Sequence, residues 1–217
     1  DNNTGVGYLA LYANTTGARN VAVGAQALDA NTTASQNTAV GYSSLSANTT
    51  GAYNTALGDE SLGSCTTGAN NTAVGNDALY STTTGTSNTA VGDQALVANT
   101  TASDNTAVGY LAMLDNTTGN SCVAVGFSAL ANNTTAHNNI AVGRDALYAN
   151  TTGTNCTAVG YSANAANTTG ASNTAVGMNS LRAVTTGGYN SCIGEGSGYS
   201  VTTASHCVGI GDHALRT

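Results

Sequence analysis

The sequence predicts an all-β fold, a single-stranded parallel β-solenoid (β-roll) of about 13 turns with 17 residues per turn and no helices of note. The first observation is a repeat: NTAVG at Asn37–Gly41 is followed 17 residues later by NTALG at Asn54–Gly58. Similar strings follow at every later step of 17 residues, without an insertion. The second is a glycine at the fifth position of all 13 copies. The third is length and composition, because helical repeats need about 33 residues or more and Gly, Thr and Asn disfavour helix.

We number the repeat so that Asn37 is position 1, and its 17 positions then read N-T-A-V-G-x-x-A-L-x-A-N-T-T-G-x-x. The copies begin at Asn3, Asn20, Asn37, Asn54, Asn71, Asn88, Asn105, Cys122, Asn139, Cys156, Asn173, Asn190 and Cys207. We therefore expect one continuous solenoid over residues 1–217, as a segment of a longer chain or fibre. Stacked at about 4.8 Å per turn, the copies would make a rod roughly 60 Å long.

Positions 2 to 4 are expected to form a short strand, because position 2 is Thr, Val, Ile or Ser and position 4 is Val, Leu or Ile. Side chains alternate along a strand, so positions 2 and 4 share one face and Ala at position 3 takes the other. We expect the Val of position 4 to face a thin core. The invariant Gly of position 5 predicts a corner with positive φ or a close backbone contact.

The rest of each turn is expected to hold a second short strand and a second corner, at the Gly or Ala of position 15. Position 8 is always Ala or Ser and position 9 is Leu in most copies, which indicates a buried pair. If position 9 points inward, alternation places positions 10, 12 and 14 outward. Asn and Thr would then stack in ladders, each side chain bonding to its copies above and below.

Charge and length exclude several classes of function. The net charge is −7, from 11 acidic residues and four arginines, and phosphate binding needs clustered Lys or Arg, so no nucleic acid is expected as a partner. No apolar run of about 18 residues occurs, so no membrane insertion is expected. The five cysteines are expected to be free and mostly buried, because those at position 1 lie roughly 10 Å or more apart, beyond the reach of a disulfide.

The strings NTAVGxxAL and NTTG resemble the haemagglutinin-type head repeats of trimeric autotransporter adhesins, and they also look like related tail-fibre-like repeat proteins. Cys122–Gly126 (CVAVG) and Asn139–Gly143 (NIAVG) come closest to the family signature. The resemblance implies a left-handed parallel β-roll, often trimeric, that projects from a cell or virion surface.

The Asn-Thr-Thr triplets provide candidate glycosylation sites, because each forms an N-x-T acceptor sequence and is expected on an exposed face. They are Asn14, Asn31, Asn48, Asn99, Asn116, Asn133, Asn150 and Asn167. Further acceptors occur irregularly at Asn2, Asn70, Asn132 and Asn155. The alternative is that these Asn and Thr side chains form unmodified ladders.

Eight of the ten tyrosines fall on two lines and provide a candidate contact surface for sugars or for a second rod. Tyr8, Tyr42, Tyr110 and Tyr161 stand at position 6, with Phe127, and Tyr12, Tyr80, Tyr148 and Tyr199 stand at position 10. The alternative is that the rings only cover the thin core.

No catalytic, cofactor or metal site is predicted. The three histidines fall at different repeat positions, and the acids near the Gly corner lack the spacing of a calcium loop. The sequence favours an extracellular structural protein rather than an enzyme: a stiff rod or filament, or an adhesin shaft, at a cell or virion surface. Its expected partners are further copies of itself, head to tail or as a homotrimer, and glycans or a host surface. The alternative is an ice-binding solenoid with threonine ladders.

Overall fold

The computed structural model describes residues 2–215 and confirms the predicted β-solenoid. It contains 13 strands of three residues each, one per copy at positions 2 to 4, and no helix among the described residues. The strands are β1 Thr4–Val6, β2 Val21–Val23, β3 Thr38–Val40, β4 Thr55–Leu57, β5 Thr72–Val74, β6 Thr89–Val91, β7 Thr106–Val108, β8 Val123–Val125, β9 Ile140–Val142, β10 Thr157–Val159, β11 Thr174–Val176, β12 Ser191–Ile193 and β13 Val208–Ile210. Residues 1, 216 and 217 of the predicted solenoid lie outside the described residues.

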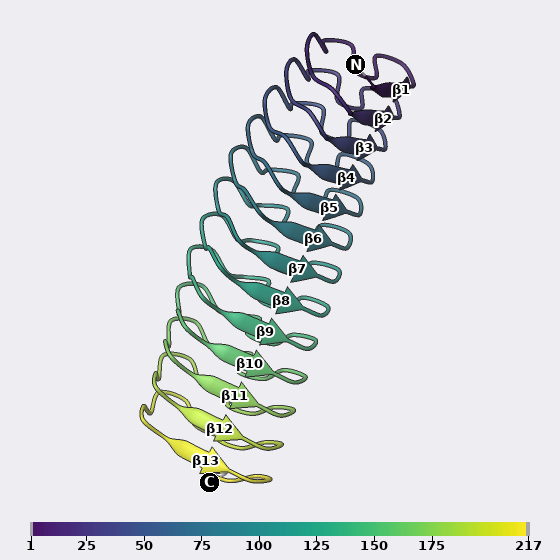
Figure 1. Ribbon diagram of the computed structural model, residues 1–217. Coiled ribbons are helices and arrows are strands. Elements are labelled where there is room, and N and C mark those ends of the chain that lie inside the picture. Colours follow the sequence, from purple (N-terminus) through teal and green to yellow (C-terminus); the bar gives the residue numbers. More distant parts are fainter. Residues whose placement is uncertain (1, 216–217) are drawn as a thin grey trace. The chain divides into compact units, whose positions relative to one another are not determined.

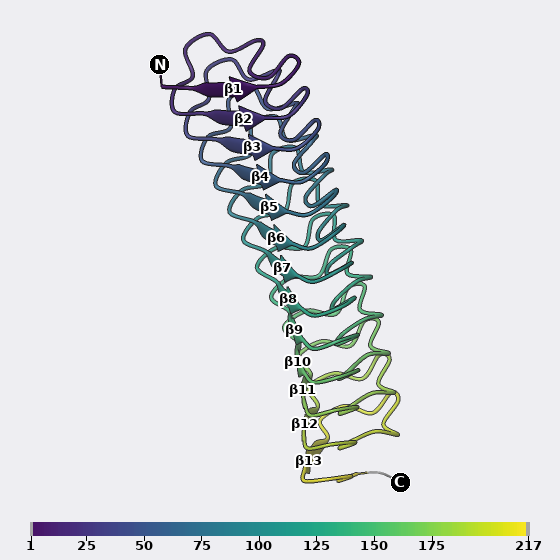
Figure 2. The ribbon, with the colours of Figure 1, turned by 90° about the vertical axis from the view of Figure 1, so that its right-hand side faces the viewer.

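The chain divides between Asn105 and Thr106 into two compact units, which hold β1–β6 and β7–β13. Within each unit the strands pair in parallel and in sequence order, as Figures 1 and 2 show, with one coil of chain leading from each strand to the next. The register is one repeat throughout each unit: Thr38 pairs with Thr55, and Thr157 pairs with Thr174. Each residue therefore lies beside its own copy in the neighbouring turn.

The strands turn their alanine inward. Ala39 at position 3 is fully buried, whereas Thr38 and Val40 on either side of it are half-buried. The expectation that Val at position 4 faces the core is therefore wrong. Alternation fixes only that positions 2 and 4 share a face. The inner face meets the position-9 leucine closely: a Cβ at Gly5, in position 3, would lie 3.6 Å from Leu11 Cδ1. The interior therefore admits a small side chain opposite leucine, and the branched residues face outward.

The core consists of position 3, position 8 and position 9, as expected for the last two. Away from the two end turns, the leucines of position 9 are fully buried in both units, for example Leu28, Leu45, Leu130 and Leu147. Ala27 and Ala146 at position 8 are buried in the same way. Met113, Asn164 and Gly198 replace leucine at position 9, and Met113 and Asn164 are also fully buried.

The predicted second strand is absent from the described turns. Positions 7, 9 and 17 have left-handed backbone in each copy; in one copy Gln26 has φ 60°, Leu28 φ 52° and Gln36 φ 62°. This conformation costs an ordinary residue about 1 kcal/mol. Hydrogen bonds to neighbouring turns hold it, because the Gln26 N–H donates to Tyr8 O at 2.8 Å and the Leu28 N–H to Ser44 O at 3.1 Å. Side-chain alternation therefore stops after the strand.

The corner at position 5 is confirmed. Its glycines have φ between 117° and 142°, a region that side chains rarely adopt. A Cβ at Gly41 would also collide with the carbonyl of Gly58 in the next turn. Both the conformation and the close approach require glycine here.

Candidate functional site

The asparagines of position 12 are interior residues, so the prediction that they line an exposed face is wrong. Seven of the eight predicted acceptors are fully buried, namely Asn31, Asn48, Asn99, Asn116, Asn133, Asn150 and Asn167; Asn14 is half-buried. The physical reason is the left-handed residue at position 9, which breaks the alternation from which outward placement was inferred. The irregular acceptors Asn2, Asn70 and Asn155 are exposed, and Asn132 is half-buried.

Both amide hydrogens of a position-12 asparagine are engaged. Asn48 Nδ2 donates to Asn31 Oδ1 and to Gly51 O, each at 3.0 Å. The same pattern links Asn133 to Asn116 at 2.7 Å and Asn150 to Asn133 at 3.1 Å. A glycan would replace one of these hydrogens inside the core, so modification at these buried residues and this fold exclude each other. We call this series the inner asparagine ladder.

A second ladder runs along position 1. The Asn37 side chain accepts from the backbone N–H of Asn54 at 2.8 Å and donates to Gly51 O at 2.9 Å. Cysteine replaces the donor at some copies, since Cys156 Sγ lies 3.3 Å from Gly170 O. All five cysteines are free, with four buried and Cys207 half-buried, as the sequence predicts. Burial raises the thiol pKa, in the case of Cys65 to about 11.

The two threonines of each triplet differ in their role. The position-13 hydroxyl donates to the backbone of the next turn, as Thr32 does to Thr49 O at 3.1 Å. Its neighbour at position 14 is exposed in each complete copy, for example Thr33 and Thr152. Position 13 is therefore structural, and the position-14 threonines form a row of surface hydroxyl groups.

The outer face of the strands forms another regular surface. It carries position 2, mostly half-buried Thr, and position 4, where Val23, Val91, Val125 and Val159 are each exposed by 36% or more. The row of position-2 residues and the row of position-4 residues lie about 7 Å apart, and successive turns repeat at about 4.8 Å. We call this surface the outer sheet face.

The predicted tyrosine residues lie on the surface. Tyr8, Tyr42, Tyr110 and Tyr161 at position 6 and Tyr12, Tyr80 and Tyr148 at position 10 are exposed, and Tyr199 is half-buried. The second unit gathers several of them on neighbouring turns. Tyr110 and Phe127 stand with ring centroids 5.6 Å apart, and the guanidinium of Arg144 lies 5.1 Å from the centroid of Phe127.

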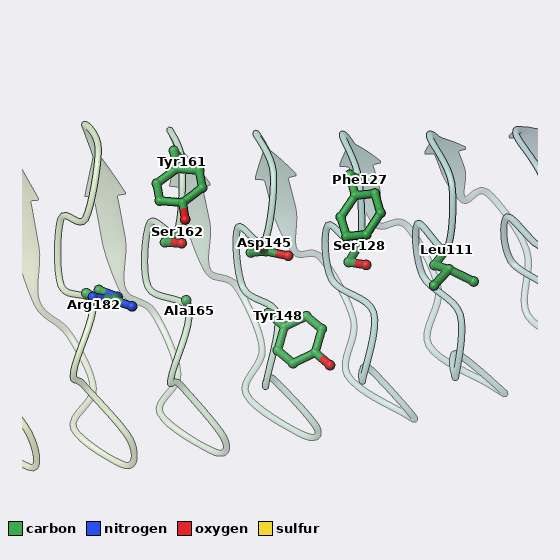
Figure 3. Close-up of a pocket in the computed structure, with 9 residues that line it drawn as sticks. All are labelled: Leu111, Phe127, Ser128, Asp145, Tyr148, Tyr161, Ser162, Ala165 and Arg182. Carbon is green, nitrogen blue, oxygen red and sulfur yellow. The ribbon is translucent and has the colours of Figure 1, made fainter.

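Phe127, Tyr148 and Tyr161 line an open groove of about 530 Å³ in the second unit. Figure 3 shows Asp145 between Phe127 and Tyr161, which belong to the turns on either side, and Tyr148 below Asp145. Leu111, Ser128, Ser162, Ala165 and Arg182 complete the lining. The carboxylate is fixed by Arg144, whose Nε lies 3.2 Å from Asp145 Oδ2. We call this site the aromatic groove.

The titratable groups do not form a metal site in the described part of the chain. No group of three or more His, Cys, Asp or Glu side chains is placed there to hold an ion. The stacked pair Tyr189 and His206, with ring centroids 5.2 Å apart, lies on the surface of the second unit. Residues 2–215 also include no helix that is long and apolar enough to cross a membrane.

The sequence predicts the tyrosine lines and indicates Asp145 only as one of the acids near the Gly corner, but it does not predict that Asp145 and Arg182 join the rings in a groove. One sequence pattern could have indicated the groove: four consecutive copies carry a large side chain at position 6, namely Tyr110, Phe127, Arg144 and Tyr161. Comparison of the chain with protein-family models, with curated proteins and with solved structures finds no match, so the resemblance to adhesin head repeats stays a prediction.

Proposed function

We propose that the chain is a structural repeat segment of an extracellular protein, a shaft, fibre or adhesin segment at a cell or virion surface. One observation carries this proposal: the side chains that the copies share are used to bind each turn to the next. The Asn31–Asn48 bond, the Asn37–Asn54 bond and the Thr32–Thr49 bond each span one repeat of 17 residues. Such a frame is self-supporting and leaves the outward positions available for contacts.

We further propose that copies associate through the outer sheet face, as a homotrimer or in a filament. This proposal is supported by the row of exposed apolar residues at position 4, which includes Val125 and Val159. Contiguous apolar surface of this kind commonly marks a protein contact. The rim offers little charge to oppose association, since charged residues make up 7% of the chain.

Small-angle scattering and negative-stain microscopy of the purified chain test the shaft, and antibody labelling of intact cells or virions tests the surface location. We expect rod-shaped particles whose mass by light scattering exceeds one chain. Val159→Lys should reduce that mass to one chain without altering the circular dichroism spectrum. Compact particles, or label that appears only after permeabilisation, would contradict the proposal.

Ice binding is a second candidate, favoured by the geometry of the outer sheet face. Thr72 and Val74 project from the same side of β5, and the same pair recurs in β3, β6 and β7. A flat, repeated array of hydroxyl and methyl groups can order water. Thermal hysteresis in the purified chain, lost in Thr72→Lys, is the expected result; no hysteresis would remove this candidate.

A further inference from the structure

We propose that the aromatic groove of the second unit binds a saccharide chain, with pyranose rings stacked on Tyr148 and Tyr161 and hydroxyl groups bonded to Asp145. The inference rests on the proposed surface role for its biological meaning, and it adds the class of ligand. It concerns only residues of the second unit.

The rings of the groove are not needed for the fold. Position 10 is Tyr148 in one turn but Ala131 and Ala165 in the turns on either side. The leucine beneath, Leu147, is fully buried, as is Leu130 in the turn that carries Ala131. Tyr148 and Tyr161 nevertheless remain 43% and 46% exposed. Exposed rings that the core does not require are available for a ligand.

Polar groups lie beside the rings, as sugar binding requires: Asp145 between Phe127 and Tyr161, and Arg182 in the turn beyond Tyr161. The carboxylate of Asp145 is 25% exposed and accepts hydrogen bonds only. The Arg182 guanidinium donates to the Tyr199 hydroxyl at 2.9 Å and lies against that ring, and its remaining N–H groups can reach ligand oxygens. A pyranose presents an apolar ring face and a rim of hydroxyl groups, so it matches this combination of aromatic faces and charged hydrogen-bonding groups.

The spacing favours an extended chain of sugars. Phe127 and Tyr161 belong to turns two steps apart, which separates them by about 10 Å. Figure 3 shows Asp145 in the turn between them. Each turn advances by about the length of one pyranose residue, so neighbouring sugars in an extended chain can meet equivalent positions on neighbouring turns.

The backbone of the groove argues against a peptide strand as the occupant. The N–H of Asp145 donates to Phe127 O at 3.0 Å and the N–H of Ser162 to Arg144 O at 2.9 Å. The Leu147 N–H likewise donates to Ala163 O at 3.0 Å. These donors are already used between turns, and strand addition depends on free backbone groups. Ring stacking and side-chain hydrogen bonds remain as the means of recognition.

Calorimetric titration of the full chain tests the proposal with four probes: cellohexaose, chitohexaose, hexagalacturonate and a decaproline peptide. We expect at least one hexasaccharide to bind and decaproline not to bind. Tyr161→Ala should weaken saccharide binding about tenfold, the loss of one stacking contact, and Asp145→Asn should weaken it by a similar factor. Preference for hexagalacturonate that disappears in Arg182→Gln would identify the saccharide as acidic; equal binding of the neutral probes would identify it as neutral.

Tyr42→Ala is the matched control, because Tyr42 occupies position 6 in the first unit and is exposed. It should leave saccharide binding unchanged within about twofold. Failure of all three saccharides to bind, binding of decaproline alone, or equal losses in Tyr161→Ala and Tyr42→Ala would overturn the proposal. Scattering and surface labelling test the proposed surface role, and calorimetry tests the groove. A rod-shaped surface protein that binds no saccharide would therefore refute only the groove proposal.

Discussion

The same surface strip differs between the two units. In the first unit, a groove of about 330 Å³ is lined by Gln26, Asp29, Ala30, Ser43, Ser46 and Ala47, all at positions 7, 10 and 11. In the second unit, the aromatic groove uses positions 7 and 10 and adds the rings of position 6. The backbone of the turn is the same in both. Outward positions can therefore change from small polar groups to aromatic rings without changing the fold.

The interior also differs between the units. The inner asparagine ladder runs unbroken from Asn116 to Asn167 in the second unit. In the first unit it is interrupted where position 12 becomes Cys65 and then Thr82. The Cys65 thiol makes only a long contact, 3.6 Å to Gly68 O. The position-5 corner is therefore invariant in both units, whereas the ladder accepts substitution.

The largest effect is expected where the units do not differ, at the position-5 corner. Gly126→Ala in the second unit places a Cβ 2.7 Å from the Gly143 carbonyl carbon at φ 133°. It should lower the free energy of unfolding by roughly 3 kcal/mol or more, measured by urea denaturation, and Gly58→Ala in the first unit should match it. Gly63→Ala, at a position that carries side chains in other copies, is the control and should cost less than about 1 kcal/mol.

The next effect should separate the units. Asn133→Ala removes the donor to Asn116 Oδ1 and to Ala136 O and the acceptor for Asn150. The buried groups that lose their hydrogen-bond partners should lower the free energy of unfolding by about 2 to 3 kcal/mol. Cys65→Ala in the first unit removes only the long thiol contact and should cost about 1 kcal/mol. Equal losses in the two variants would show that the ladder bonds contribute little.

Alkaline pH should weaken the first unit through Cys65. Burial raises its pKa from 9.0 to about 11, so the folded state holds the proton that the unfolded state loses. The stabilisation is complete below pH 9 and is lost progressively between pH 9 and about 11, by about 3 kcal/mol. Hydrogen exchange followed by mass spectrometry of each unit measures this. Cys65→Ala should abolish the difference, and an unchanged pH profile in that variant would exclude the thiol as the cause.

The smallest effect is a gain in the second unit. Asn164 is fully buried at a leucine position, and neither its Nδ2 nor its Oδ1 has a partner. Asn164→Leu should raise the free energy of unfolding by about 1 to 3 kcal/mol, because it removes two buried polar atoms that have no partner. About 1 kcal/mol of this gain should be lost, because asparagine tolerates the φ of 49° at this position better than leucine does. We expect a net gain near 1 kcal/mol in urea denaturation, with Asn133→Leu losing stability as the matched control. A loss in Asn164→Leu would indicate that the amide is satisfied after all.

The repeat, the strands and the corners could be predicted because each depends on a local rule. An invariant glycine such as Gly41 indicates its own backbone conformation, and an inward leucine such as Leu45 follows from its apolar character. The facing of the strand could not be predicted in this way. Three residues alternate equally well in either direction, and the choice depends on how much room Leu11 leaves opposite position 3.

The burial of the asparagines could not be predicted from alternation either. Left-handed backbone at residues such as Gln26 and Leu28 is not signalled by their side chains, because these types seldom adopt it. Hydrogen bonds from neighbouring turns supply the compensation, and a single repeat does not show them. The candidate groove was likewise visible in part: its tyrosines fell on the predicted lines, but the partners Asp145 and Arg182 depend on which turns lie side by side.

The fixed separation of the ladder bonds has a genetic consequence. The bonds of Asn31 with Asn48 and of Thr32 with Thr49 join residues 17 apart in sequence. Gain or loss of one whole repeat leaves every later residue opposite a residue of the same kind, whereas gain or loss of a single residue displaces every later partner in that turn. Unequal recombination between copies would therefore change the length of the chain by whole repeats and preserve these bonds.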